Sequence, residues 1–208
     1  MKRITYLFLS IICLLISSLL FGAAKRAEHE ALAAEISPGI LRFHILANSN
    51  SREDQDLKLE VRSFLLDEIY RGLFSDNGND SVTKEDMVTY ITTNSTSLEQ
   101  KAETYMQRKG YQYPVNIRIA DTYFPTKYYG DIQLPCGTYQ AANVSIGNGE
   151  GHNWWCVLYP RLCFIDSSWA VLPESSKEEL EQMVGETNYK KLVCQRPALK
   201  LGLPELLQ

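Results

Sequence analysis

The sequence predicts an α+β fold: a single domain with a mixed or antiparallel sheet and two longer helices packed on one face, preceded by an N-terminal export signal or anchor helix. Three observations predict it. The order of periodic segments is one strand, two helices, several strands and two short helices. Apolar residues alternate in the predicted strands and recur at helical spacing in the predicted helices. The length of 208 residues suits one domain behind a leader.

The leader is an uncharged stretch over residues 4–22 that follows Lys2 and Arg3. A short basic start, an apolar run and small residues at 22–24 are typical of an export signal. A helix of this length covers about 28 Å, so the same stretch could also anchor the chain in a membrane. The basic residues would stay in the cytoplasm, and everything beyond Lys25 would lie outside.

Residues 40–47 are predicted as the first strand. Arg42 and His44 share one of its faces. The other face carries an apolar row formed by Leu41, Phe43, Ile45 and Ala47. A strand of this pattern packs one face on a core.

Two helices are predicted to follow this strand. Ser51 and Asp54 resemble a capping box, and the helix that they start ends near Leu73. The same signature at Thr83 starts the second helix. Poor helix formers over residues 92–97 make a break possible there.

The period changes to two beyond residue 110. Strands are predicted at 115–119, 138–146 and 154–158, with a bend over residues 124–130. A short acidic helix at 173–184 precedes a second short one. The chain therefore ends in small helices rather than in further strands.

Composition and motifs argue against several function classes. Lys and Arg number 21 against 25 Asp and Glu, and two of the basic residues lie in the leader, so nucleic acid is not an expected partner. The glycines over residues 146–151 precede a Trp-rich strand instead of the helix that a phosphate-binding loop needs. No C-x-x-C or H-x-x-x-H pair supplies a zinc chelate. We expect no cofactor and no metal.

Cysteines offer either a disulfide or a nucleophile. Those outside the leader allow three pairings: Cys136, Cys156, Cys163 and Cys194. Only six residues separate Cys156 from Cys163, and Pro160 bends the chain between them. A bridge there would contribute roughly 2.5 kcal/mol on the loop-entropy model. We favour this disulfide over the alternative, a thiol nucleophile at Cys156 or Cys163 with His44 or His152 as its base.

Trp154 and Trp155 belong to the densest aromatic group of the chain. Adjacent residues on a strand point to opposite faces, so the two indoles cannot both enter one core. One is expected in the core and the other on the second side of the sheet, where an exposed Trp is typical of a protein-binding hot spot.

Four segments carry a family resemblance: Leu41–Ser49 running into Asp54, Gln55 and Lys58; Phe124–Thr126 with Tyr129 and Gly130; Leu134–Tyr139; and Asn153–Phe164. In this order they resemble the signature of the stage II sporulation protein R family. The resemblance implies a protein exported from the forespore into the intermembrane space of the sporulation septum. It also implies that the protein triggers a membrane-embedded aspartic protease of the mother cell, which removes the pro-sequence of a sigma factor.

On this basis we expect a signalling protein that is not an enzyme and touches the membrane only through its N-terminal segment. The expected organisation is a signal peptide or signal anchor at 1–24, a spacer at 25–39, a signalling domain at 40–172 and a C-terminal helical extension at 173–208. An exported thiol hydrolase and a cell-wall-binding module are the alternatives. The candidate partner-binding residues are Arg42, His44, Asn48, Asp54, Gln55, Lys58, Phe124, Tyr129, Asn153, Trp154 and Trp155.

The polar members of this set allow two interpretations. A hydrogen-bond network of Arg42, His44 and the residues around Asp54 could fix the corner between the first strand and the first helix. The same group could instead bind the receptor. The sequence leaves both open.

Overall fold

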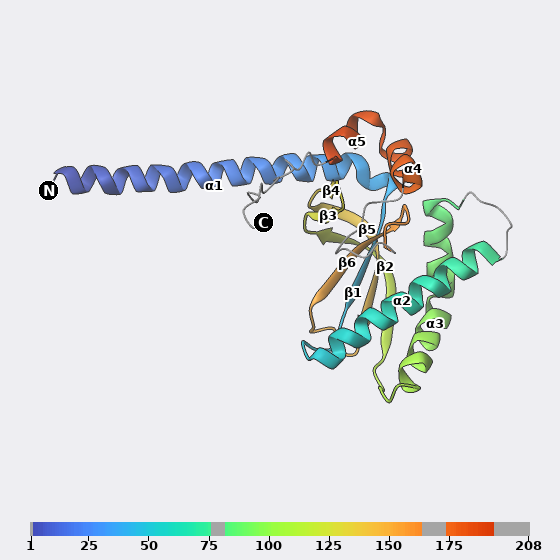
Figure 1. Ribbon diagram of the computed structural model, residues 1–208. Helices are drawn as coiled ribbons and strands as arrows, with labels where there is room; N and C mark the ends of the chain where they lie inside the picture. Colours follow the sequence, from blue (N-terminus) through green and yellow to red (C-terminus); the bar gives the residue numbers. More distant parts are fainter. Residues whose placement is uncertain (1, 76–81, 164–173, 194–208) are drawn as a thin grey trace, which may run out of the picture.

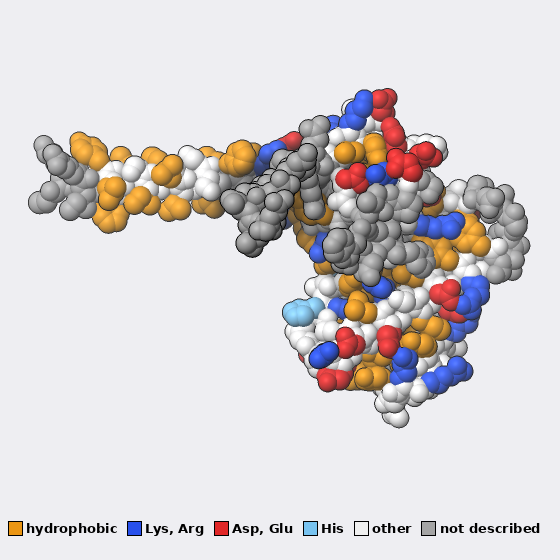
Figure 2. All heavy atoms as spheres, in the orientation of Figure 1, with side chains coloured by type: hydrophobic (Ala, Val, Ile, Leu, Met, Phe, Trp, Pro, Cys, Tyr) orange, Lys and Arg blue, Asp and Glu red, His pale blue; other side chains and the backbone are white. Residues whose placement is uncertain are grey.

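The apolar leader forms the outer part of one long helix, α1 (Lys2–Ile36), that projects from the rest of the molecule (Figure 1). The computed structural model describes residues 2–75, 82–163 and 174–193. The segment Tyr6–Gly39 is long and apolar enough to cross a membrane, and none of its most apolar window is buried. Figure 2 shows hydrophobic side chains along this projecting part, whereas the body of the molecule carries mixed charges.

A four-stranded mixed sheet lies at the centre of the body, in the order β2-β5-β1-β6. The bounds of its strands are β1 (Leu41–Leu46), β2 (Val115–Phe124), β5 (Gly137–Ile146) and β6 (Asn153–Tyr159). β1 runs parallel to β5, and the other neighbouring pairs are antiparallel. The predicted α+β fold with a mixed sheet is therefore confirmed.

Two helices, α2 (Arg52–Ser75) and α3 (Lys84–Gln107), pack on one face of this sheet, as predicted. Thr83 and Asp86 form a complete capping box at the start of α3. α3 continues through residues 92–97 without a break, because Leu98 and Ala102 are buried against the sheet and this packing outweighs the weak helix formers.

The second face of the sheet is covered as well, so β1 is buried on both sides. Its cover consists of the end of α1, the short helix η1 (Ser37–Gly39), the hairpin of β3 (Lys127–Tyr129) and β4 (Ile132–Leu134), and the helices α4 (Glu174–Val184) and α5 (Glu186–Leu192). The hairpin occupies the region where only a bend was expected. Figure 1 shows these elements on the side of the sheet away from α2 and α3.

The end of α1 docks closely on β5. Ala33 and Ile36 are buried in the second core. A Cβ atom at Gly137 of β5 would collide with the Cβ of Ala33, so glycine at this position permits the close approach. The segment 25–39, expected as a spacer, therefore lies in α1 and η1 and contributes to the core.

Candidate partner-binding site

The corner between β1 and α2 is built from four of the candidate residues. The carboxylate of Asp54 accepts hydrogen bonds from Asn48 Nδ2 at 2.9 Å and from Ser49 Oγ at 2.6 Å. Gln55 Nε2 donates to the carbonyl of Ser49 at 2.8 Å, and Lys58 Nζ donates to Gln55 Oε1 at 2.6 Å. Asn48, Asp54, Gln55 and Lys58 thus form one hydrogen-bond network.

This network also holds the connection between β5 and β6. Lys58 Nζ donates to the carbonyl of His152 at 2.8 Å, and Asn48 Oδ1 accepts from the backbone N–H of Asn148 at 3.0 Å. Gly147, at a φ of 58°, sits so close to Asn48 that a side chain there would collide with it. The contacts favour a structural role for these polar residues.

Burial and hydrogen bonding set the charge states at the corner. Burial raises the pKa of Asp54, but hydrogen bonds from Ser49 and Asn48 outweigh it and leave this pKa below its ordinary value. Burial lowers the pKa of Lys58, whose ammonium group donates to two neutral oxygens, those of the Gln55 side chain and the His152 carbonyl.

A second group of candidate residues gathers on the sheet face that α1 and the hairpin cover. The ring of His44 stacks on Trp155, with ring centroids 3.9 Å apart. The His44 ring nitrogens lie 3.0 Å from Asn143 Oδ1 and 2.7 Å from Asn153 Oδ1. Phe124 packs edge-on against Trp155 at 4.7 Å. The aromatic stack therefore joins β1, β2 and β6.

Arg42 lies beside this stack. Its Nε donates to the carbonyl of Cys156 at 2.9 Å, and its guanidinium lies over the rings of Phe124 at 4.2 Å and Tyr139 at 5.0 Å. Its Nη2 is 3.5 Å from the Tyr129 hydroxyl. Burial lowers the pKa of Arg42.

Arg42 and His44 do share the face opposite the apolar row, but they are 0 % and 8 % exposed. Alternation places residues on a face and does not say whether that face meets water or a second layer.

Trp154 points to the other face of β6, as the alternation predicts. It packs against the first core beneath Arg62, whose guanidinium carbon is 4.4 Å from the indole centroid. Trp155 packs against the second core. Both indoles are partly buried, and the sheet separates Trp154 from His44, Phe124 and Trp155.

Sequence reasoning did not select Tyr139 and Asn143 as site residues. Asn143 Nδ2 donates to the carbonyls of Ala120 and Ala141, which directs its Oδ1 towards His44. Tyr139 donates from its hydroxyl to the carbonyl of Pro135 and supports Arg42 with its ring. Their spacing of four residues on one strand places both on the same face, which is the signal that could have found them.

Cys156 and Cys163 form a disulfide, with Cα atoms 5.4 Å apart. The bridge closes the turn after β6, where Arg161 lies 3.9 Å from the ring centroid of Phe74 on α2. Cys136 is not disulfide-bonded, and Cys194 lies outside the described residues.

Within the described ranges, no three His, Cys, Asp or Glu side chains come together as metal ligands would.

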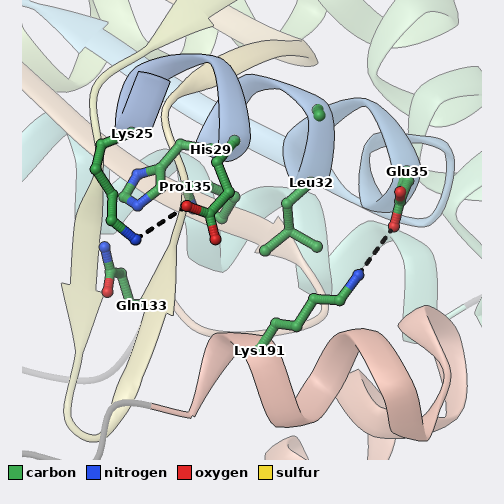
Figure 3. A pocket seen from close by; sticks show the side chains of 9 residues that line it. Lys25, His29, Leu32, Glu35, Gln133, Pro135 and Lys191 are labelled. Carbon is green, nitrogen blue, oxygen red and sulfur yellow. Dashed lines mark hydrogen bonds and ion pairs between the residues drawn. The ribbon is translucent and has the colours of Figure 1, made fainter. Parts of the chain in front are cut away.

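A hollow of about 420 Å³ lies between α1 and the elements β4 and α5 (Figure 3). Figure 3 shows Lys25, His29 and Gln133 at one end and Lys191 with Glu35 at the other. Lys25 is 2.9 Å from Glu28, and Lys191 is 3.5 Å from Glu35. The first ion pair lies within α1 and the second joins α1 to α5, so the hollow marks the outer edge of the docked helix.

Comparison with known proteins places the chain in a family. Residues 37–169 match the family model of stage II sporulation protein R. The stage II sporulation protein R of Bacillus subtilis (strain 168) is 33 % identical over 190 residues, which cover 86 % of this chain and 82 % of the relative. No solved structure matches. The chain therefore belongs to the stage II sporulation protein R family, and its role lies in sporulation signalling.

Proposed function

We propose that the chain is an exported signalling protein that activates a membrane-embedded aspartic protease, which then removes the pro-sequence of a mother-cell sigma factor precursor. It acts by binding, without chemistry of its own. Export from the forespore delivers it to the intermembrane space of the septum. Membership of the family and the apolar outer part of α1 support this route.

One observation supports binding over catalysis. The two cysteines that a thiol hydrolase would use, Cys156 and Cys163, are bonded to each other and buried. A thiolate is the nucleophile in such enzymes, and a disulfide sulfur cannot take that role. The bridge also suits a protein that works outside the reducing cytoplasm.

The partner-binding surface in this proposal is the rim of the second sheet face. Asn153 is exposed there, and Tyr129 and Trp155 are partly exposed. Partly exposed aromatic side chains on a rigid strand contribute contact area at a small entropic cost. The corner residues around Asp54 then support the surface without touching the partner.

Co-expression in a non-sporulating host tests the proposal. The full chain, the membrane protease and the sigma precursor are produced together, and the shortened sigma factor is scored by immunoblot. We expect processing only when all three are present, and none with a protease variant that lacks a catalytic aspartate. Equal processing with and without the chain would refute activation.

Two cysteine variants separate binding from catalysis in the same assay. We expect Cys156→Ser and Cys163→Ser to lower processing equally, because either change removes the same bridge. If one variant abolishes processing while the other retains it at equal amounts of folded, partner-bound protein, a reactive thiol is at work and the thiol hydrolase gains.

A further inference from the structure

The guanidinium of Arg42 is fully buried, and no carboxylate of the described residues pairs with it. Among the residues that the structure describes, its Nη1 has no hydrogen-bond partner. Neutral groups surround the rest: the carbonyl of Cys156, the hydroxyl of Tyr129 and the rings of Phe124 and Tyr139. Within the described part of the chain, the charge therefore lies inside the domain without a counter-ion.

Such a charge opposes folding. The free energy lost when a guanidinium leaves water is several times larger than the free energy gained from a few contacts with neutral groups. Burial accordingly lowers the pKa of Arg42. Buried polar atoms are almost always paired, so a free Nη1 calls for an explanation. An unbranched apolar side chain of similar length would fill the same space at lower cost. The internal contacts alone do not account for an arginine here.

One edge of the Arg42 guanidinium is poorly hydrogen-bonded. The Nε bond to Cys156 O fixes the plane of the group. The two terminal nitrogens form the opposite edge, whose only hydrogen-bond contact from a described residue is the 3.5 Å one between Nη2 and Tyr129 Oη. Two parallel N–H groups on this edge match the two oxygens of a carboxylate.

Tyr129 covers this edge, and it belongs to an element outside the main sheet. β3 and β4 pair with each other, and neither joins the four-stranded sheet. The hydroxyl of Tyr129 lies 3.4 Å from the carbonyl of Trp155, a second long contact. The hairpin that carries Tyr129 is thus held over Arg42 by these long contacts, by the ion pair of Asp131 with Lys177 of α4 at 3.1 Å and by the buried side chains of Ile132 and Leu134.

We propose that Arg42 is a carboxylate-binding residue, that the β3–β4 hairpin covers it in the free protein, and that its ligand is an Asp or Glu side chain of the partner. This site deepens the proposed function, since it rests on the chain binding a partner protein. When the partner docks, its carboxylate replaces the Tyr129 hydroxyl and pairs with Nη1 and Nη2.

A chemical-rescue experiment tests the anion site without any partner. Tyr129→Ala removes the phenol and leaves space above the guanidinium of the full chain. The probe is sodium acetate, compared with sodium chloride at equal ionic strength. We expect acetate to raise the melting temperature of Tyr129→Ala by about 2 °C or more, because it binds only the folded state. The double variant Tyr129→Ala, Arg42→Met should show no such rise. An equal response of both variants would refute the site.

The processing assay supplies a second readout, which remains usable if Tyr129→Ala does not fold. We expect Arg42→Met to be at least as stable as the unmodified chain and to need at least about tenfold more protein for half-maximal processing. Lys84→Met is the matched control, because Lys84 is also a buried cation on carbonyl oxygens, but those oxygens belong to η1 and not to the hairpin. It should leave processing unchanged at equal amounts of folded protein.

The two proposals fail in different ways. If the unmodified chain does not activate processing, the proposed function is wrong, and the acetate result still decides whether Arg42 binds carboxylates. If the unmodified chain activates processing and Arg42→Met does so equally, the proposed function stands and the role of Arg42 in partner binding is refuted.

Discussion

The carboxylate of Glu99 on α3 accepts a hydrogen bond from the backbone N–H of Ile117 on β2, at 2.7 Å. Glu103, one turn later, accepts from the N–H of Val115 at 3.0 Å. β2 is an edge strand, and such strands expose unpaired N–H groups that can template aggregation. The two glutamates occupy two of the N–H donors, at the start of β2, that a further strand would need.

This edge gives the first prediction. Glu99→Ala leaves the N–H of Ile117 without its acceptor, so we expect the free energy of unfolding to fall by about 1–2 kcal/mol. Glu99→Gln keeps an acceptor oxygen and should lose less. Hydrogen exchange at the Ile117 amide is the direct measurement. Equal exchange rates in the Ala and Gln variants would contradict the account.

The second prediction concerns Trp155. Replacing it with alanine removes the stacking partner of His44 and leaves a cavity beside Phe124. We expect a loss of about 3 kcal/mol in urea denaturation of the detergent-solubilised chain. Leu59→Ala, on the exposed side of α2, is the control and should cost about 0.5 kcal/mol or less. Similar losses in both variants would show that Trp155 packs loosely.

The third prediction decides between the two roles considered for the corner. Lys58→Ala removes the donor to the carbonyl of His152 and to Gln55, so we expect a loss of about 1–3 kcal/mol and a clearly lower melting temperature. Signalling should fall only as far as the amount of folded protein falls. Arg52→Ala, on an exposed ion pair, should change neither. Lost signalling at an unchanged melting temperature would instead make Lys58 a receptor contact.

The fourth prediction is a pH dependence. The pKa of Asp54 in the folded protein is below its ordinary 3.8. A lowered carboxyl pKa contributes stability that is fully present above 3.8 and is lost as the pH falls through the folded-state pKa. The free energy of unfolding should therefore depend less on pH in Asp54→Asn than in the unmodified chain over this acidic range. As the pH falls, the difference in free energy of unfolding between the two proteins should shrink. A constant difference would mean that Asp54 does not titrate in this way.

Much of the fold was predictable, because alternation and helical spacing are strong where a segment packs on one core. The row of Leu41, Phe43 and Ile45 predicts β1, and the capping box at Thr83 predicts the start of α3. The hairpin was not predictable, since β3 and β4 have three residues each and show no readable period. The docking of α1 was not predictable, because the sequence pattern around Ala33 and Ile36 is the same for a helix that packs on the sheet and for one that does not.

The candidate site was predictable as a set of residues and not as an arrangement. The motif segments supplied Arg42, His44 and Trp155, which meet on one face. Nothing local in the sequence separates them from the corner group of Asp54 and Lys58, because that division depends on which elements cover the second face. A charged residue in an alternating strand suggests exposure, and only the long-range cover by α1 and the hairpin buries Arg42.

Because α1 is one unbroken helix, the angle between its apolar part and the rest of the domain is fixed. A helix turns by 100° per residue, and its inner end is fixed against β5 through Ala33 and Gly137. While the apolar part stays in a bilayer, one alanine inserted between Ala24 and Lys25 would swing the whole domain by about 100° around the helix axis, and four would almost restore its direction. The phase of the helix therefore fixes which residues of its apolar part lie on the same side as each face of the domain.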